Sequence, residues 1–354
     1  MANYKADVQK KLENEKEQLY EKIPEFLYIF LEEILPSQSN ELRSHIAVGT
    51  DILVFLRYIS ENVINKDVKE INTLDLDKLT LMDFNNFFRY ITSYKVNYID
   101  RLGNSKIQVR TNSQTSKARK LSSLKKLFNY LESKGLIHHN YIKEMKIKKP
   151  NQTKIDNRLN KVEVYELKDL IDEGKNICNE RQQKAFERLK VRDLTIFMIF
   201  AYTGIRVSEL VSLDITDVNT NKCTLKVVRK GNKIQEIPYP EEVSNYLNDY
   251  LKYREQKHTM VSPESKKALF LSQQNRRITD KAVRNLLQKY AKRANIDEVT
   301  CHTLRRTFLS NLYNSTQDIK LTAKIGGHSV TTASTYYADV DEERYIKEIK
   351  KFSY

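Results

Sequence analysis

The octet Thr203 to Leu210, which reads TGIRVSEL, is the feature that most constrains the fold of this chain. It follows a dense apolar run from Leu194 to Tyr202, so it predicts a buried helix that is interrupted at Gly204 and then resumes. A buried guanidinium is costly without partners. Arg206 therefore either pairs with Glu209, three residues on, or points into a cleft and binds an anion. The octet alone leaves both roles open.

Length and composition predict a soluble protein with two domains. A chain of 354 residues can form two full cores, and 40% hydrophobic with 30% charged residues is a globular balance rather than a disordered one. The N-terminus lacks the pattern of a signal peptide, and the longest apolar run is about half of a membrane span. We therefore expect a cytoplasmic location and no membrane contact. Cys178, Cys223 and Cys301 are odd in number and widely spaced, which favours reduced packing residues over disulfides or a zinc site.

The net charge of +15 is distributed unevenly along the chain. Residues 1–100 hold 12 Lys and Arg against 17 Asp and Glu, whereas residues 101–150 hold 13 against 2 and residues 251–300 hold 12 against 5. Two separate basic blocks on an otherwise balanced chain indicate two surfaces that face one polyanion. A long nucleic acid is the partner that these blocks predict.

Hydrophobic periodicity predicts a mainly α-helical fold with a small β-hairpin. We expect a helical DNA-binding domain over residues 1–145, a linker over 146–161, a mixed α/β domain over 162–340 and a C-terminal helix over 341–354. The first domain should have helices at 5–34, 41–64, 80–96 and 116–131, with an exposed loop at 99–114. The second should have helices up to about residue 212 and at 241–255, 279–294 and 303–314, and a hairpin over 223–239 around Gly231 and Asn232.

Two helices carry the basic blocks. The helix at 116–131 has Leu121, Leu124, Phe128 and Leu131 on one face and a basic, hydroxyl-rich opposite face, and residues 101–131 contain no acidic side chain. Such a helix can follow DNA phosphates or enter a groove. The helix at 279–294 should be capped by Thr279. The side chains that we predict to bind DNA are Lys117, Arg119, Lys120, Arg276, Arg277, Lys281 and Arg284.

Residues suited to phosphodiester chemistry follow the octet in order. Lys230 lies beside the hairpin turn, His302 and Arg305 lie three apart on one helical face, His328 follows two glycines, and Tyr336 and Tyr337 come next. Arginines neutralise phosphate oxygens, histidines transfer protons, lysine protonates a leaving oxygen and tyrosine attacks. The chain has 21 tyrosines, so composition alone cannot identify the nucleophile.

This ordered set resembles the tyrosine recombinase family, and looks most like Xer-type enzymes that act alone, of the XerH or XerS kind. The resemblance rests on the octet at 203–210, Arg229 to Lys233 in a hairpin, His302 to Arg305, and Gly327-His-Ser with a tyrosine nine residues after the histidine. It implies a catalytic set of Arg206, Lys230, His302, Arg305, His328 and Tyr337, with Glu209 supporting Arg206. The sequence departs from the family's usual residues at Arg306, Gly326 and Ala338-Asp339, and none of these differences removes a catalytic group.

By this resemblance, Tyr337 forms a 3′-phosphotyrosyl link and releases a 5′-hydroxyl, without ATP or metal, and the two domains form a clamp around DNA. The expected assembly is a homotetramer on two specific sites, with a DNA translocase as a further candidate activator. Chromosome dimer resolution, which serves cell division, and integration of a phage or genomic island both fit. A type IB topoisomerase and a non-catalytic DNA-binding regulator are the alternatives of other classes.

The C-terminal segment after Tyr337 carries an apolar stripe of Tyr345, Ile346, Ile349 and Phe352 at three- and four-residue steps. A helix this short is marginal alone, so its stripe must dock on something. Its own domain is one candidate. The resemblance favours a neighbouring subunit in a closed ring of four.

Deleting residues 342–354 should therefore leave binding to a single half-site nearly intact but abolish cooperative occupancy of a full site and strand exchange. Gel shifts on half-sites and full sites measure both effects. Cooperative binding that survives the deletion would show that the segment folds back onto its own domain.

Overall fold

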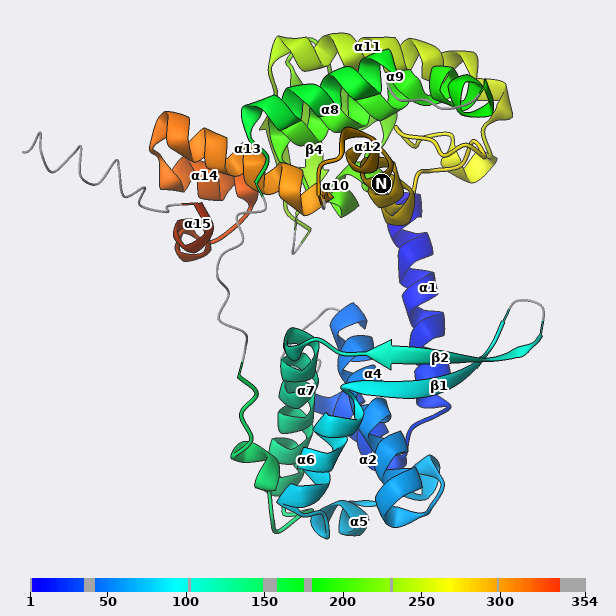
Figure 1. Cartoon of the computed structure of the whole chain (residues 1–354), viewed down its shortest axis with the longest axis vertical. Helices are drawn as coiled ribbons and strands as arrows, with labels where there is room; N and C mark the ends of the chain where they lie inside the picture. Colours follow the sequence, from blue (N-terminus) through cyan, green and yellow to red (C-terminus); the bar gives the residue numbers. More distant parts are fainter. Residues whose placement is uncertain are drawn as a thin grey trace, which may run out of the picture. The chain divides into compact units, whose positions relative to one another are not determined.

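The computed structural model describes residues 2–34, 42–100, 103–148, 158–174, 180–229, 232–297 and 299–337 (Figure 1). The chain divides into two compact units, one of residues 5–155, called the N-terminal unit, and one of residues 156–354 that also takes in residues 1–4. Helices dominate both units, each with one small antiparallel sheet, so the predicted fold class is confirmed. Most of the predicted linker, and the C-terminal segment from residue 338, lie outside the described residues.

The N-terminal unit is a helical bundle with a two-stranded ribbon. Its helices are α1 (Ala2–Tyr20), α2 (Glu25–Ile29), α4 (Leu42–Ile59), α5 (Thr73–Asp77), α6 (Leu81–Tyr90) and α7 (Gln114–Ser133). Short π-helical turns follow two of them, η1 (Phe30–Ile34) and η2 (Ser60–Ile64), and 3₁₀ turns lie at η3 (Val68–Glu70) and η4 (Tyr141–Lys143). The ribbon consists of β1 (Ser93–Ile99) and β2 (Ser105–Thr111).

The helices predicted at 41–64 and 116–131 are confirmed, and those at 5–34 and 80–96 are corrected in part. The first of these is broken before Glu25, because Pro24 cannot donate a backbone hydrogen bond and stands at the N-terminus of α2. The second begins as predicted, with the Asp83 carboxylate accepting from the Thr80 backbone N–H at 2.8 Å. It ends at Tyr90, and the next residues turn into β1.

The loop predicted at 99–114 is exposed as expected, but half of it, residue 99 and residues 105–111, belongs to the ribbon and is not a loop. Ser93 pairs with Thr111 and Ile99 with Ser105, in a regular antiparallel register. The β-branched residues Val96, Ile107 and Val109 favour strands, but both faces of the ribbon are largely open to solvent. A search for buried apolar runs therefore misses it.

The second unit contains the elements around the octet. Its helices are α8 (Lys161–Glu173), α9 (Glu180–Thr203), α10 (Val207–Ser212), α11 (Glu241–Gln256), α12 (Asp280–Ala294), α13 (Cys301–Thr316), α14 (Ile319–Gly326) and α15 (Val330–Tyr337). Its sheet has the order β3 (Val218–Asn219), β4 (Thr224–Val228) and β5 (Ile234–Pro238), and 3₁₀ turns lie at η5 (Ile215–Asp217), η7 (His258–Met260) and η8 (Pro263–Ser265). The predicted helices up to residue 212 and at 241–255, 279–294 and 303–314, and the hairpin, are confirmed. Helices α14 and α15 were not predicted.

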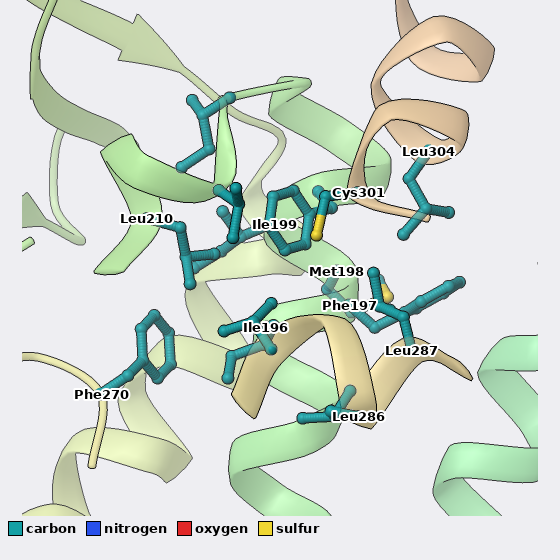
Figure 2. Packing of buried hydrophobic residues seen from close by; sticks show 14 of the residues in the cluster. Ile196, Phe197, Met198, Ile199, Leu210, Phe270, Leu286, Leu287, Cys301 and Leu304 are labelled. Carbon is teal, nitrogen blue, oxygen red and sulfur yellow. The ribbon is translucent and has the colours of Figure 1, made fainter. Parts of the chain in front are cut away.

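The core of the second unit is built around the apolar end of α9. Figure 2 shows Ile196, Phe197, Met198 and Ile199 of this helix surrounded by Leu210, Phe270, Leu286, Leu287, Cys301 and Leu304, which come from α10, the chain before α12, and helices α12 and α13. Because α9 is packed on several sides, the ends of α10 and α13 beside it are held firmly. In the part of the chain that the structure describes, no helix is long and apolar enough to cross a bilayer.

A buried carboxylate joins α4 to α7 in the N-terminal unit. Asp51 is 1% exposed and accepts from Lys120 Nζ at 3.1 Å, from Ser123 Oγ at 3.1 Å and from the Arg119 guanidinium. Lys120 is itself buried. Breaking such an ion pair destabilises the fold, because removal of one partner leaves the charge of the other buried and uncompensated.

We predict that Asp51→Ala lowers the free energy of unfolding of the N-terminal unit by about 3 kcal/mol. The matched control is Glu61→Ala, because Glu61 is an exposed acid in the same unit and its removal should change stability by less than about 0.5 kcal/mol. Urea unfolding followed by circular dichroism compares them. Equal stabilities for the two variants would show that Lys120 finds another partner.

Candidate active site

The octet forms the junction between α9 and α10, as predicted. Gly204 has a φ of +57°, and a Cβ there would lie 2.6 Å from Cδ1 of Phe308, so this turn requires glycine. Arg206 caps α10, and its backbone N–H donates to Glu209 Oε2 at 2.8 Å. Its guanidinium donates to Glu209 Oε1 at 2.8 Å and to the Gly327 carbonyl at 3.1 Å. The ion pair with Glu209 is thus formed, and the Arg206 side chain remains 33% exposed.

Arg305 lies on α13 with its side chain buried. Its guanidinium donates to the carbonyls of Gly204 and Gly326 and lies 2.9 Å from Nε2 of His328. His302 precedes it by three residues on the same helix, and its side chain is exposed. The structure therefore brings together Arg206, Arg305 and His328, and places His302 one helical turn from Arg305.

His328 follows α14 at a turn that Gly327 makes with a φ of +57°. A guanidinium can only donate, so Nε2 of His328 accepts from Arg305 and the proton of the neutral ring is on Nδ1. Burial lowers the pKa of His328 to about 4, helped by the positive charges of Arg305, Arg206 and Arg229. The ring is therefore neutral at physiological pH. Loss of hydration, and then Arg305, also lower the pKa of His302.

Tyr337 ends α15 and is 4% exposed. Its ring lies edge-on to the His328 ring, with centroids 6.1 Å apart. Burial raises the pKa of the Tyr337 hydroxyl, although Arg305, Arg306 and Arg206 oppose this shift. Tyr336 is 52% exposed, and the Arg306 guanidinium lies 5.7 Å from its ring centre. Of the two tyrosines, Tyr337 is the one beside His328.

The hairpin brings a residue that was not predicted into this cluster. The Arg229 side chain is 7% exposed and donates to Glu209 Oε1 at 3.3 Å and to the Ile325 carbonyl at 2.7 Å. In the sequence it is one more basic residue beside a turn, so no local signal distinguishes it. Lys230, the next residue, lies outside the described residues.

The cluster holds more positive than negative charge. Arg206, Arg229 and Arg305 surround Glu209, which is 4% exposed. Burial lowers the pKa of Arg305 to about 10, and the charge of Arg206 acts in the same direction. Buried like charges of this kind attract an anion that can approach them. A singly charged phosphodiester has the appropriate charge and oxygen ligands.

The predicted DNA-binding side chains fall into two groups. Lys117, Arg119, Arg276, Lys281 and Arg284 are at least partly open to solvent, with Lys117 Nζ bonded to Thr92 Oγ1 and Arg119 paired with Asp51. Lys120 and Arg277 are held inside their units, where Lys120 pairs with Asp51 and Arg277 donates to Asp214 and to the Val211 and Leu213 carbonyls. The Thr279 cap of α12 is confirmed by the 3.2 Å bond from the Ala282 N–H.

Across the described residues, no three His, Cys, Asp or Glu side chains are grouped so that they could hold a metal ion. Cys223 and Cys301 are free thiols, and burial raises the pKa of Cys301 to about 11. Cys178 lies outside the described residues.

The sequence and the fold of this chain are similar to those of the following known proteins. Residues 162–344 match the phage integrase family. The chain is 28% identical over 339 residues to tyrosine recombinase XerC of Caldanaerobacter subterraneus subsp. tengcongensis, covering 93% of this chain and 87% of that protein. It is 29% identical over 297 residues to tyrosine recombinase XerS of Streptococcus agalactiae, covering 78% and 81%. Its fold is similar to that of XerH recombinase in a post-cleavage complex with its difH substrate, with a TM-score of 0.62, 20% identity, and coverage of 87% and 79%.

The position of the basic side chains yields a prediction about DNA affinity. Neutralising Arg276, Lys281 and Arg284 together should reduce the slope of log affinity against log salt by about one for each phosphate that these side chains neutralise in the wild-type protein. Arg277→Met should instead lower the melting temperature, because it removes a partner of Asp214. Filter binding at several salt concentrations and thermal unfolding distinguish the two results. An unchanged salt slope in the triple variant would place the DNA interface elsewhere.

Proposed function

The chain belongs to the phage integrase family and is a Xer-like tyrosine recombinase, an enzyme that cleaves and rejoins DNA; from this premise we propose that Tyr337 is its nucleophile. The supporting observation is that the buried Tyr337 ring lies edge-on to the His328 ring, and that the positive charges of Arg305, Arg306 and Arg206 act on its hydroxyl group. Arg206, Lys230, His302, Arg305 and His328 are the other proposed catalytic residues, and Glu209 orients Arg206.

The proposed reaction is an exchange of phosphate esters. The Tyr337 oxygen attacks phosphorus and forms a bond to the 3′-phosphate, while the bond to the 5′-oxygen breaks. When Arg305 turns from Nε2 of His328 to the phosphate, that nitrogen is free to accept the phenol proton, and Lys230 supplies a proton to the 5′-oxygen. Arg206 and Arg305 neutralise the charge that develops on the non-bridging oxygens. One ester replaces another, so resealing by the 5′-hydroxyl of a partner strand requires neither ATP nor metal.

For the biological role, we propose recombination at a specific double-stranded DNA site that resolves chromosome dimers before cell division. The similarity to XerC and XerS along most of the chain supports this choice. The proposed assembly is a homotetramer on two sites in the cytoplasm, with a DNA translocase as a candidate activator. Recovery and sequencing of the DNA that becomes covalently attached to the protein tests the role. A chromosomal site supports dimer resolution, whereas the ends of a mobile element support integration.

We predict that Tyr337→Phe binds site DNA with unchanged affinity but forms no covalent adduct, because phenylalanine keeps the packing and lacks the attacking oxygen. The measurement uses a nicked substrate that traps the adduct, built on the recovered site, and denaturing gels. Tyr336→Phe is the matched control, since Tyr336 is the exposed neighbour and should retain cleavage.

An adduct in Tyr337→Phe together with none in Tyr336→Phe would assign the nucleophile to Tyr336. Cleavage should also persist in EDTA. Relaxation of a supercoiled plasmid that lacks the specific site would instead favour a topoisomerase-like activity.

A further inference from the structure

We propose that Arg229 is a positioning residue for DNA cleavage, because it fixes the turn that presents His328 to Tyr337. The inference rests on the proposed roles of these two residues. Arg229 directly follows β4 and is far along the chain from that turn, yet its guanidinium contacts the last carbonyls of α14.

Three contacts tie the hairpin to the active site. Nη2 of Arg229 donates to the Ile325 carbonyl at 2.7 Å, and Nη1 donates to the Gly326 carbonyl at 3.2 Å and to Glu209 Oε1 at 3.3 Å. The last carbonyls of a helix have no partner within the helix, and a cation at this end is favourable. Arg229 therefore closes the C-terminal end of α14 and links it to the carboxylate that holds Arg206.

The turn before His328 is closely fitted to Arg229. Gly327 has a φ of +57°, and a Cβ there would lie 2.7 Å from Nη1 of Arg229. At Gly326 a Cβ would lie 2.7 Å from Cδ2 of His328. These two glycines let Arg229 and the His328 ring approach the backbone closely. A shift of Arg229 would consequently allow the turn, and His328 with it, to move.

Fold stability alone does not account for a guanidinium at this position. Arg229 is buried near Arg206 and Arg305, and within the described parts of the chain its buried Nε–H has no acceptor. An unmet buried donor costs about 1–3 kcal/mol. Burial, and after it the charge of Arg206, lower the pKa of Arg229, although Glu209 opposes this shift. Unfavourable features of this kind concentrate at functional sites.

Charge and geometry can be separated with two variants. Arg229→Lys keeps the charge, but an ammonium on a flexible stem cannot reproduce the fixed fork of contacts. Arg229→Met removes both. Lys226→Met is the matched control, because Lys226 is an exposed basic residue on β4, the strand that Arg229 follows, and no contact joins it to the described residues of the site.

The test measures cleavage of the nicked site substrate at saturating DNA, together with the dissociation constant. In both Arg229 variants the cleavage rate should fall by about tenfold to a hundredfold, as expected for a displaced catalytic group, while DNA affinity stays within about twofold of wild type. Lys226→Met should cleave at the wild-type rate.

Protonation of His328 gives a second readout. Arg229→Met removes a positive charge that depresses the pKa of His328, so the ring should titrate at higher pH, whereas Arg229→Lys should leave the titration near its original position. Nuclear magnetic resonance of the histidine ring, assigned with His328→Asn, follows this change in the full-length protein. This pKa change depends on charge alone, so a loss of cleavage in Arg229→Lys at an unchanged His328 pKa and wild-type thermal stability assigns the loss to the position of the guanidinium.

Near wild-type cleavage in Arg229→Met, with Tyr337→Phe inactive, would overturn this inference and leave the proposed function intact. Covalent adduct in Tyr337→Phe would refute the proposed nucleophile instead. If both Arg229 variants lose DNA affinity and thermal stability as much as cleavage, the residue is structural and the inference is wrong.

Discussion

The cluster that we propose as the active site depends on one buried carboxylate. Glu209 accepts from the Arg206 backbone and side chain and from Arg229, and it is the negative partner that the described residues provide at the centre of three arginines. Two like charges 4 Å apart repel by about 4 kcal/mol at the effective dielectric constant near a protein surface. The negative charge of Glu209 offsets part of this repulsion, and the cluster keeps a net positive charge. A bound phosphate would neutralise that charge, so the repulsion between arginines in the free site favours binding of the substrate.

Two glycines with left-handed backbone supply further partners of these arginines. Gly204 and Gly327 both have a φ of +57°, and their carbonyls accept from Arg305 and Arg206 respectively. A side chain at either position would be strained and would also meet Phe308 or Arg229. The glycines of the two motifs therefore do more than loosen the chain. They turn backbone carbonyls toward guanidinium groups, which lets a site with few carboxylates keep its cations in place.

The sequence rules for helix breaks, helix caps and turns predicted the features that depend on residues close together in the chain. The break at Gly204, the caps at Thr80 and Thr279 and the hairpin around Asn232 all depend on residues within a few positions of one another. The ribbon was missed because its exposed faces bear no burial pattern. The partner of Arg119 and Lys120 could not be predicted either, because Asp51 lies 68 or more residues away. Arg229 was missed for the same reason, since α14 brings its acceptors from 96 residues further along the chain.

The protonation states in the free protein bear on how a phenol can attack. Burial raises the pKa of Tyr337, so the hydroxyl keeps its proton, and His328 is neutral with a pKa of about 4. A phosphodiester that enters the cluster adds negative charge beside both groups, which raises both pKa values. Tyr337 then becomes harder to ionise, whereas His328 becomes a better base. For the reaction that we propose, substrate binding therefore favours proton transfer during attack over a phenolate formed in advance, which would couple that reaction to the presence of DNA.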